Sequence, residues 1–412
     1  MLKIQTRNLV IWFSLGLGLL FNLNIAHAHG EKALEPFIRT RTIQWFDVQW
    51  SEPNVSVNDE VVVTGKFHVA EDWPISVPKP DAAFLNISVP GPVMIRTERY
   101  LNGQPWINSV ALQPGADYHF KVVLKARYPG HFHVHPFFNL KDAGPVMGPG
   151  QWITIGGEAS DFSNSVTTLN GKIIDMETYG LVNGAMWHGL WLAIGLAWLL
   201  WWLRRPLFLP RYKLMTTGKD DLLVTNLDRN IAKIILVTVP VVVFAASSIT
   251  QSNHPTSIPL QTALDRIEPL TQEVNTQVKV KVLKAEYHVS ARSMVLTVNI
   301  HNDSSTSLRI GEFSAANLRF LNADLEQPSQ RQNEIDPMTI NDSLHVSDKT
   351  PIAPGETRIL TFDATDANWK NEKFDGLVND SDSRLGGLLF FYGEDGTRLI
   401  TSISAAVLPR FN

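Results

Sequence analysis

Two long apolar segments constrain the fold of this 412-residue chain more than any other feature. The first runs from about 181 to 203, and the second from about 231 to 249. A helix that crosses a bilayer needs about 20 mostly apolar residues, so both segments predict transmembrane helices. The loop between them, 204–230, carries six Lys and Arg residues, which places it in the cytoplasm by the positive-inside rule. The sequence therefore predicts a membrane hairpin over 181–250 with both flanking regions in the periplasm.

The first 28 residues have the features of a secretory signal peptide. Lys3 and Arg7 precede and flank an apolar stretch, and the sequence Ala-His-Ala at 26–28 forms a small-residue cleavage site. Cleavage after Ala28 leaves His29 as the amino terminus of the mature chain. Together with the hairpin, this signal predicts a protein of the inner (cytoplasmic) membrane of a bacterium.

The composition excludes several classes of partner and site. The net charge is −4, so there is no basic excess to neutralise phosphates, and no nucleic-acid partner is expected. Cysteine is absent, which removes disulfides and every thiolate metal site. A transition metal bound to this chain must therefore use histidine, carboxylate or amine ligands.

Both regions outside the hairpin are predicted to be all-β. In the first, 29–180, alternating runs such as 61–69 and 118–124 are separated by Pro and Gly turns. In the second, 266–412, the runs 278–282 and 294–300 alternate in the same way. Several short strands at this spacing favour a Greek-key sandwich. We expect a mainly β chain with two periplasmic β-sandwich domains joined by a two-helix transmembrane hairpin.

A histidine cluster and the predicted amino terminus together suggest a metal site. His131, His133 and His135 are spaced by two, so on a strand all three point to one face, with neighbours about 6.5–7 Å apart along it. Two adjacent members can share an ion, whereas the third lies too far away. The amine and imidazole of His29 raise the set to four nitrogens, which suits Cu(II) best. The alternatives are a zinc site, or a strand whose histidines are only polar surface.

The remaining histidines and the carboxylates give no pattern that indicates a catalytic or metal site. His68, on a probable strand, is expected to be a hydrogen-bonded structural residue, and His188 lies near the periplasmic end of the first apolar segment. The carboxylates show no paired acid/base arrangement. The sequence contains no nucleophile elbow, phosphate-binding glycine loop or dinucleotide fingerprint.

A series of motifs along the chain resembles the B subunit of the copper membrane monooxygenases, the family of particulate methane monooxygenase and ammonia monooxygenase. The matching segments occur in order from the predicted amino terminus almost to the end of the chain. They are His-Gly-Glu-Lys at 29–32, 41–47, Gly-Lys-Phe-His at 65–68, Pro-Gly-His-Phe-His-Val-His at 129–135, 144–150, 311–313, 383–389 and 407–409.

The resemblance implies two cupredoxin-like domains, at 29–180 and 266–412, and a complex with two more hydrophobic subunits, A and C, as a trimer of heterotrimers. It places copper on His29, His133 and His135, with His131 outside the ligand set. A second copper site of some family members pairs two histidines, which correspond here to His68 and Gln44. Glutamine is a poor ligand for copper, so this second site is expected to be absent or weak.

The implied reaction inserts one oxygen atom from O2 into a small substrate. Methane, ammonia and another short hydrocarbon remain open, because different segments resemble different members of the family. The resemblance also leaves open whether the copper on His29, His133 and His135 is the active centre, so the catalytic residues are unknown. The alternative from a different class is a periplasmic copper-binding or scaffold subunit, with the chemistry on partner subunits.

Overall fold

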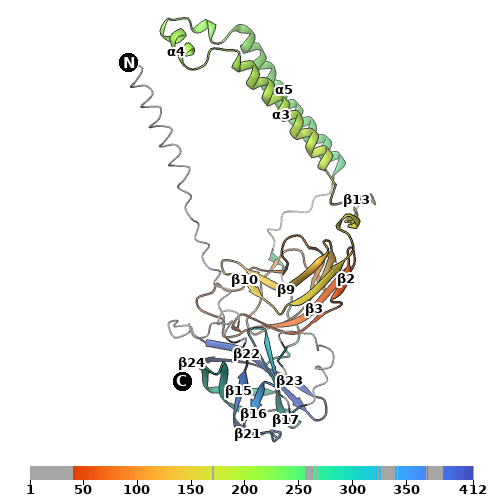
Figure 1. Cartoon of the computed structure of the whole chain (residues 1–412), viewed down its shortest axis with the longest axis vertical. Coiled ribbons are helices and arrows are strands. Elements are labelled where there is room, and N and C mark those ends of the chain that lie inside the picture. The colour runs from red at the N-terminus through yellow and green to blue at the C-terminus, as the bar shows by residue number, and fades with distance from the viewer. Residues whose placement is uncertain are drawn as a thin grey trace. The chain divides into compact units, whose positions relative to one another are not determined.

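The computed structural model describes most of the chain beyond its first 39 residues, as two compact units (Figure 1). The described residues are 40–168, 171–255, 264–265, 267–322, 324–325, 339–340, 342–367, 369 and 384–411. One unit comprises residues up to 162 together with those from 261 onward, and the other comprises 163–260. The predicted signal peptide and His29 lie outside the described residues.

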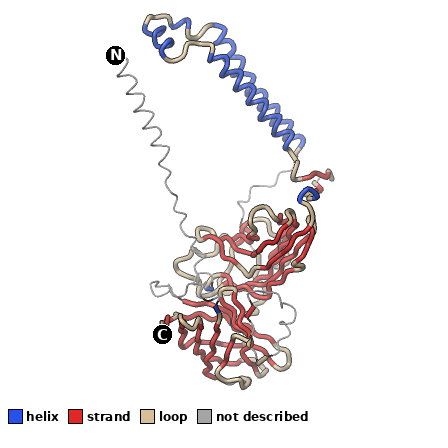
Figure 2. Tube along the Cα trace, in the orientation of Figure 1, coloured by secondary structure: helices blue, strands red, loops and turns tan. Residues whose placement is uncertain are grey.

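The N-terminal part of the first unit is a sandwich of two sheets, drawn mainly in red strands in Figure 2. The first sheet has the order β1 (Ile43–Trp50), β3 (Glu60–Val69), β8 (Asp117–Ala126), β5 (Met94–Leu101), β6 (Gln104–Pro105). The second has the order β14 (Leu264–Asp265), β7 (Ser109–Val110), β4 (Ala83–Ser88), β9 (Gly130–Leu140), β11 (Gln151–Gly156), β2 (Asn54–Ser56), and β10 (Gly144–Met147) pairs with β9. Neighbouring strands are mostly not consecutive in sequence, as in a Greek-key arrangement.

An aromatic cluster fills the space between these two sheets. Trp45 of β1 and Phe67 of β3 lie 5.7 Å apart between ring centroids. Phe120 of the same sheet is 5.3 Å from Trp45, and Phe138 of β9 is 4.7 Å from Phe67. Every second residue of each strand points inward, so the period-two pattern of the sequence delivers these rings to one core. The cluster fixes β9, and with it the histidine face, against the rest of the sandwich.

The C-terminal part of the first unit is a second sandwich. One sheet has the order β20 (Leu344–Val346), β21 (Thr357–Thr365), β16 (Ser293–Asn302), β15 (Val278–His288), β24 (Leu408–Arg410). The other has the order β19 (Thr339–Ile340), β18 (Leu318–Leu321), β17 (Leu308–Ala315), β22 (Arg384–Gly393), β23 (Arg398–Ala406). Its core contains Phe313, Phe320, Phe362 and Trp369, all fully buried.

Asp117 connects the N-terminal sandwich to the segment that enters the C-terminal one. Its Oδ1 lies 2.6 Å from Nδ1 of His68, and both side chains are buried. Its Oδ2 accepts hydrogen bonds from the backbone N–H groups of Glu273, at 2.6 Å, and Val274, at 3.0 Å. The carboxylate thus accepts hydrogen bonds from backbone N–H groups that follow the two apolar helices in the sequence. Buried backbone donors need such acceptors, so the contact allows the two parts to pack together.

Asp72 makes a second connection between the sandwiches. It pairs with Arg41 at 3.2 Å and with Arg384 of β22 at 2.8 Å, and it accepts a hydrogen bond from Ser404 of β23. Burial of the carboxyl would raise its pKa, but the bonds from Ser404 and Arg384 and the charge of Arg41 hold the pKa below its usual value. The carboxylate therefore stays ionised and keeps the two arginines paired.

The segment after the hairpin returns to the N-terminal sandwich before the C-terminal one begins. β14 pairs in parallel with β7, and Leu270 donates a backbone hydrogen bond to the carbonyl of Asp117 at 2.9 Å. The first strand of the C-terminal sandwich, β15, starts only at Val278. The predicted C-terminal region, 266–412, therefore includes a short stretch that packs on the N-terminal sandwich.

The second unit contains the two apolar helices. It consists of a small ribbon, β12 (Ser165–Thr167) with β13 (Ile173–Asp175), followed by α3 (Leu181–Leu203), α4 (Leu209–Thr216) and α5 (Asn226–Asn253). Short 3-10 turns occupy Ala159–Asp161, in the first unit, and Asp220–Leu222, in the second. Both α3 and α5 are long and apolar enough to cross a membrane, and no residue of the apolar window of either helix is buried. Their side chains are therefore not part of a core within the described residues.

α5 begins earlier than its apolar segment because of a capping box. The hydroxyl of Thr225 accepts from the backbone N–H of Asp228, and the Asp228 carboxylate accepts from the Thr225 backbone N–H. Pro240 lies inside α5 and does not end it. The predicted fold class, two β-sandwich parts with two apolar helices between them, is confirmed.

Candidate metal centre

β9 presents the three clustered histidines on one face. Val134 and Phe138 of this strand are fully buried in the core, and the odd-numbered positions His131, His133 and His135 point away from that core. β9 lies between β4 and β11 in its sheet, so its backbone is held on both edges. The site therefore stands on a rigid central strand.

His133 and His135 are in direct contact. Their ring centroids are 4.3 Å apart with the ring planes at 84°, and Nδ1 of His133 lies 2.9 Å from Nε2 of His135. Two nitrogens bound to adjacent corners of one ion, at about 2.0–2.1 Å each, are about 2.9 Å apart. The facing atoms are at hydrogen-bond distance, and this is also the separation of two nitrogens that meet one ion at a right angle.

The orientation of His135 is set by its neighbours. Its Nδ1 lies 2.9 Å from the carbonyl oxygen of Gly148, to which an Nδ1–H donates. With the proton on Nδ1, the neutral ring has its lone pair on Nε2, the atom that faces His133. Gly150 lies against the same ring, where a β-carbon would come within 2.5 Å of it. These contacts leave His135 a single position.

His133 is poised to remain neutral. Partial burial lowers the pKa of its imidazole, and the nearby ring of His135 lowers it further. Its Nε2 is buried and has no hydrogen-bond partner among the described residues. The lowered pKa favours the neutral imidazole, which is the form that binds a metal ion.

His131 is held apart from this pair. Its Nδ1 lies 3.0 Å from the hydroxyl of Thr154 on β11, and its ring stacks on Trp152 with centroids 4.7 Å apart and planes at 6°. Trp152 is directly opposite His133 in the β9–β11 register and lies 4.8 Å from the His133 ring. The indole therefore separates His131 from the His133–His135 pair on the sheet surface.

Trp152 was not expected from the sequence. Its position depends on the register between β9 and β11, which are separated by β10 and its turns. The available signal was the alternation of 151–156, which places Trp152 on the face opposite Ile153 and Ile155. That pattern marks an outward aromatic residue but does not reveal which strand it faces.

The described residues supply two of the three expected ligands, His133 and His135, whereas His29 lies outside them. Within the described part of the chain, no group of three His, Cys, Asp or Glu side chains is close enough to hold a metal ion. The pair His133–His135 is thus a partial site.

Gln44 and His68, at which the family resemblance implied a second copper site, are directly opposite each other in the register of β1 and β3. His68 is occupied at Nδ1 by Asp117. The amide of Gln44 donates to the carbonyl of Thr40 at 2.9 Å and accepts from the hydroxyl of Ser402 at 2.9 Å. Both atoms of the Gln44 amide thus serve the packing between the sandwiches.

His188 also has a local role. Its Nδ1 lies 2.7 Å from the carbonyl oxygen of Gly184, one turn earlier in α3. A hydrogen bond of this kind within a helix orients the ring without implying a ligand.

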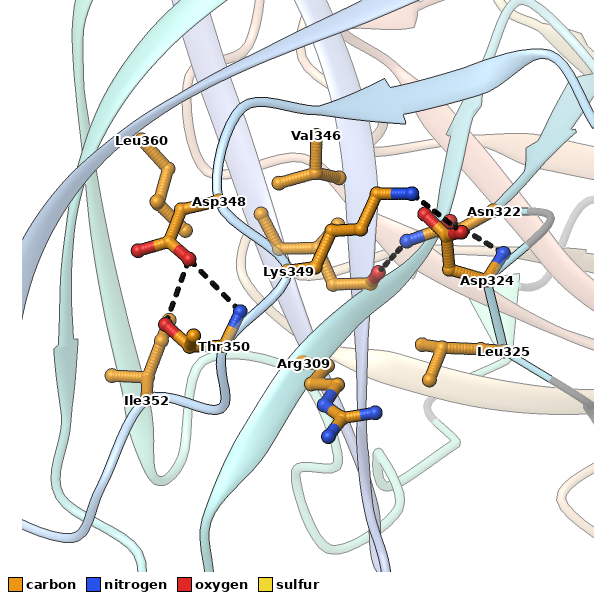
Figure 3. A pocket seen from close by; sticks show the side chains of 11 residues that line it. Arg309, Asn322, Asp324, Leu325, Val346, Asp348, Lys349, Thr350, Ile352 and Leu360 are labelled. Carbon is orange, nitrogen blue, oxygen red and sulfur yellow. Dashed lines mark hydrogen bonds and ion pairs between the residues drawn. The ribbon is translucent and has the colours of Figure 1, made fainter.

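A cavity of about 280 Å³ lies in the C-terminal sandwich (Figure 3). Asp348 accepts hydrogen bonds from the backbone and hydroxyl of Thr350, and Lys349 pairs with Asp324 at 2.7 Å. None of the described residues that line it is a histidine. Since these charged groups are already engaged with neighbours, the cavity is a weaker candidate for metal chemistry than the histidine pair.

These features define a class of protein: two β-sandwiches, two candidate membrane helices and a pair of contacting histidines on one sandwich. The family model of the monooxygenase B-subunit protein matches residues 30–411. The chain is also 44% identical over 387 residues to a protein of Methylococcus capsulatus (Bath) named "Particulate methane monooxygenase alpha subunit", covering 94% of this chain and 93% of the relative. The chain therefore belongs to the family of monooxygenase B subunits, as the sequence predicted.

Two solved structures with some similarity to this chain align with low TM-scores. The cupredoxin domain of amoB from Nitrosocaldus yellowstonii aligns with 29% of this chain and 91% of its own, at 19% identity and a TM-score of 0.24. The N-terminal periplasmic domain of ScsB from Proteus mirabilis aligns with 89% of this chain and 99% of its own, at 7% identity and a TM-score of 0.18. At these scores neither similarity supports a functional argument.

Proposed function

We propose that this chain is the copper-binding subunit of a membrane monooxygenase that inserts one oxygen atom from O2 into a small substrate. The observation that carries the proposal is the contact between Nδ1 of His133 and Nε2 of His135 in a member of the monooxygenase B-subunit family. The family is that of a multi-subunit enzyme, so other subunits are required. We propose two hydrophobic subunits, A and C, as partners in a trimer of heterotrimers at the inner membrane, with both sandwiches in the periplasm.

The proposed ligands are the amine and imidazole of His29 and the imidazoles of His133 and His135. An all-nitrogen set favours copper over zinc, which does not need the terminal amine. Copper bound here would supply one-electron redox chemistry with O2. The protein's own contribution is to lower the pKa of His133 through partial burial, to orient the His135 ring through the Gly148 carbonyl, and to hold the facing nitrogens of the two rings close together.

The substrate class follows from the relative. The Methylococcus protein is named as a methane monooxygenase subunit, so we propose methane or a molecule of similar size, ammonia included. Oxidation of methane to methanol, or of ammonia to hydroxylamine, takes one atom of O2 into the product and reduces the other to water with two electrons from an external donor. Labelled O2 supplied to membranes that contain the complex distinguishes these substrates by the labelled product formed.

Addition of one alanine before His29 tests the terminal ligand. We expect a sharp loss of copper affinity, because the free amine then belongs to alanine and no longer forms a chelate with the histidine ring. The measurement is copper per full-length chain together with the Cu(II) spin-resonance spectrum, with the mature amino terminus established by mass spectrometry. Unchanged affinity in a chain shown to begin with the added alanine would refute the terminal chelate.

Gly150→Ala tests the support of His135. The new β-carbon would lie 2.5–2.8 Å from three atoms of the His135 ring, so the ring must leave the position in which its Nε2 faces His133. We expect copper affinity to fall about 10–100-fold, the range seen when the outer support of a ligand is lost. Gly156→Ala is the matched control at the end of β11, because its nearest neighbour is the Val55 carbonyl oxygen at 3.9 Å. Equal affinities of the two variants would show that the His135 position is not set by this contact.

A further inference from the structure

We propose that α4, the short helix in the turn of the hairpin, binds the headgroup layer of an anionic membrane (Figure 1). Its outer surface combines Phe208 with Leu209, Tyr212 and Met215, which are 88%, 67%, 65% and 56% exposed. We call these four residues the α4 apolar face. The proposal rests on the hairpin crossing a bilayer and is independent of copper binding.

The α4 apolar face has the geometry of an interfacial helix. Leu209, Tyr212 and Met215 are spaced by three, so they follow one side of the helix. At 3.6 residues per turn, Arg211 and Lys213 fall on opposite flanks of this line. Apolar and aromatic residues bordered by basic ones are typical of helices that lie in the plane of a membrane surface.

The position of the face relative to the bilayer follows from the end of α3. Trp201 and Trp202 close this helix, as in an aromatic belt at the headgroup level. Asp228 of α5 accepts hydrogen bonds from the Trp201 indole at 2.8 Å and from Arg205 at 2.7 Å, so both helices are joined there. Only residues 204–208 separate α3 from α4, and five residues reach at most about 18 Å. α4 is therefore confined to the neighbourhood of the headgroups.

The charge of the turn selects an anionic lipid surface over a protein partner. Residues 204–230 carry six Lys and Arg against three Asp, and α4 itself has two basic residues and no acid. Each basic residue near an anionic leaflet strengthens binding about fivefold. Lysine is depleted at the cores of protein interfaces, whereas here Lys213 borders the apolar face directly.

The absence of cysteine from the chain makes a single-label test possible. Met215→Cys places a spin label on the α4 apolar face, and Thr217→Cys places the same label just past the end of α4. The full chain is reconstituted in vesicles of phosphatidylcholine and phosphatidylglycerol at about 3:1, and in phosphatidylcholine alone. Collision rates with dissolved O2 and with a water-soluble nickel complex then report the depth of each label.

For each label we compare the collision rate with O2 to the collision rate with the nickel complex. In the anionic vesicles we expect this ratio to be at least about tenfold higher for the label at 215 than for the label at 217. Adding Arg211→Gln and Lys213→Gln should reduce the ratio of embedded to solvent-exposed label about 25-fold, at about fivefold per charge. Equal collision rates with nickel at 215 and 217 would overturn the proposal. Equal burial of the label at 215 in the anionic vesicles and in phosphatidylcholine alone would also overturn it. Protection of 215 that appears only when the chain is reconstituted together with its partner subunits, and not when it is reconstituted alone, would assign the face to a protein subunit instead. Copper content, measured on the same samples, reports separately on the proposed function.

Discussion

His133→Ala and His135→Ala are each expected to abolish copper binding at the proposed centre. Each variant removes one of the two facing nitrogens, which are 2.9 Å apart in the structure. Since the loss of outer support alone weakens metal sites about 10–100-fold, removal of a ligand should cost more than about 100-fold in affinity. The measurement is copper per full-length chain and the Cu(II) spin-resonance spectrum of the assembled complex.

His131→Ala is the matched control for both variants. It lies on the same face of β9, but its ring is bonded to Thr154 and stacked on Trp152. We expect its copper content to equal that of the unmodified chain. Equal loss in all three variants would show that the wrong pair of histidines was chosen.

The same variants separate a catalytic from a scaffold role. If oxygen insertion stops when copper is lost from His133→Ala, the chemistry depends on this subunit. If the complex assembles and turns over at its normal rate without this copper, the chemistry belongs to partner subunits and this chain serves as scaffold. Assembly must therefore be measured alongside product formation.

Asp117→Ala is expected to destabilise the chain by about 3–5 kcal/mol. The substitution leaves the His68 ring and the backbone N–H groups of Glu273 and Val274 without their carboxylate acceptor. Each buried donor left unsatisfied costs about 1–3 kcal/mol. Urea unfolding of the full chain in detergent, followed by intrinsic fluorescence, measures the free energy of unfolding.

Asp59→Ala provides the comparison for Asp117. Asp59 also accepts a backbone hydrogen bond through its carboxylate, from Ser56 at 2.7 Å, but this bond is at the exposed surface of a turn. We expect a loss below about 1 kcal/mol there, because water replaces the lost acceptor. A similar small loss for Asp117→Ala would mean that the junction between the sandwiches does not depend on this carboxylate.

The alternation of residues along strands and the length of the apolar segments predicted individual strands and helices correctly. The alternation within β9 correctly placed His131, His133 and His135 on one face, and the two apolar segments correspond to α3 and α5. The choice of His133 with His135 came from the family resemblance, because spacing alone treats the three histidines as two equivalent neighbouring pairs. The structure gives a physical reason for that choice, since stacking on Trp152 holds His131 apart.

Features that depend on pairing between distant segments could not be predicted in this way. Trp152 reaches the histidine face through the register of β11 against β9. Asp117 meets Glu273 across 156 positions of sequence. No local period encodes such contacts, because they are fixed only when the sheets and sandwiches have packed together.

The return of the segment after the hairpin to the N-terminal sandwich has a consequence for biogenesis. β14, at Leu264–Asp265, and the donors to Asp117 are synthesised only after both apolar helices. A chain emerging from its amino terminus at about 5–20 residues per second therefore exposes an unfinished first domain for several seconds. During that interval the edge of β7 that pairs with β14 has no partner strand, and the whole segment with both apolar helices must be synthesised before the domain can close. A soluble fragment that stops before the hairpin would preserve this unfinished state, whereas one that joins the segment from 264 onward to the first sandwich would complete it.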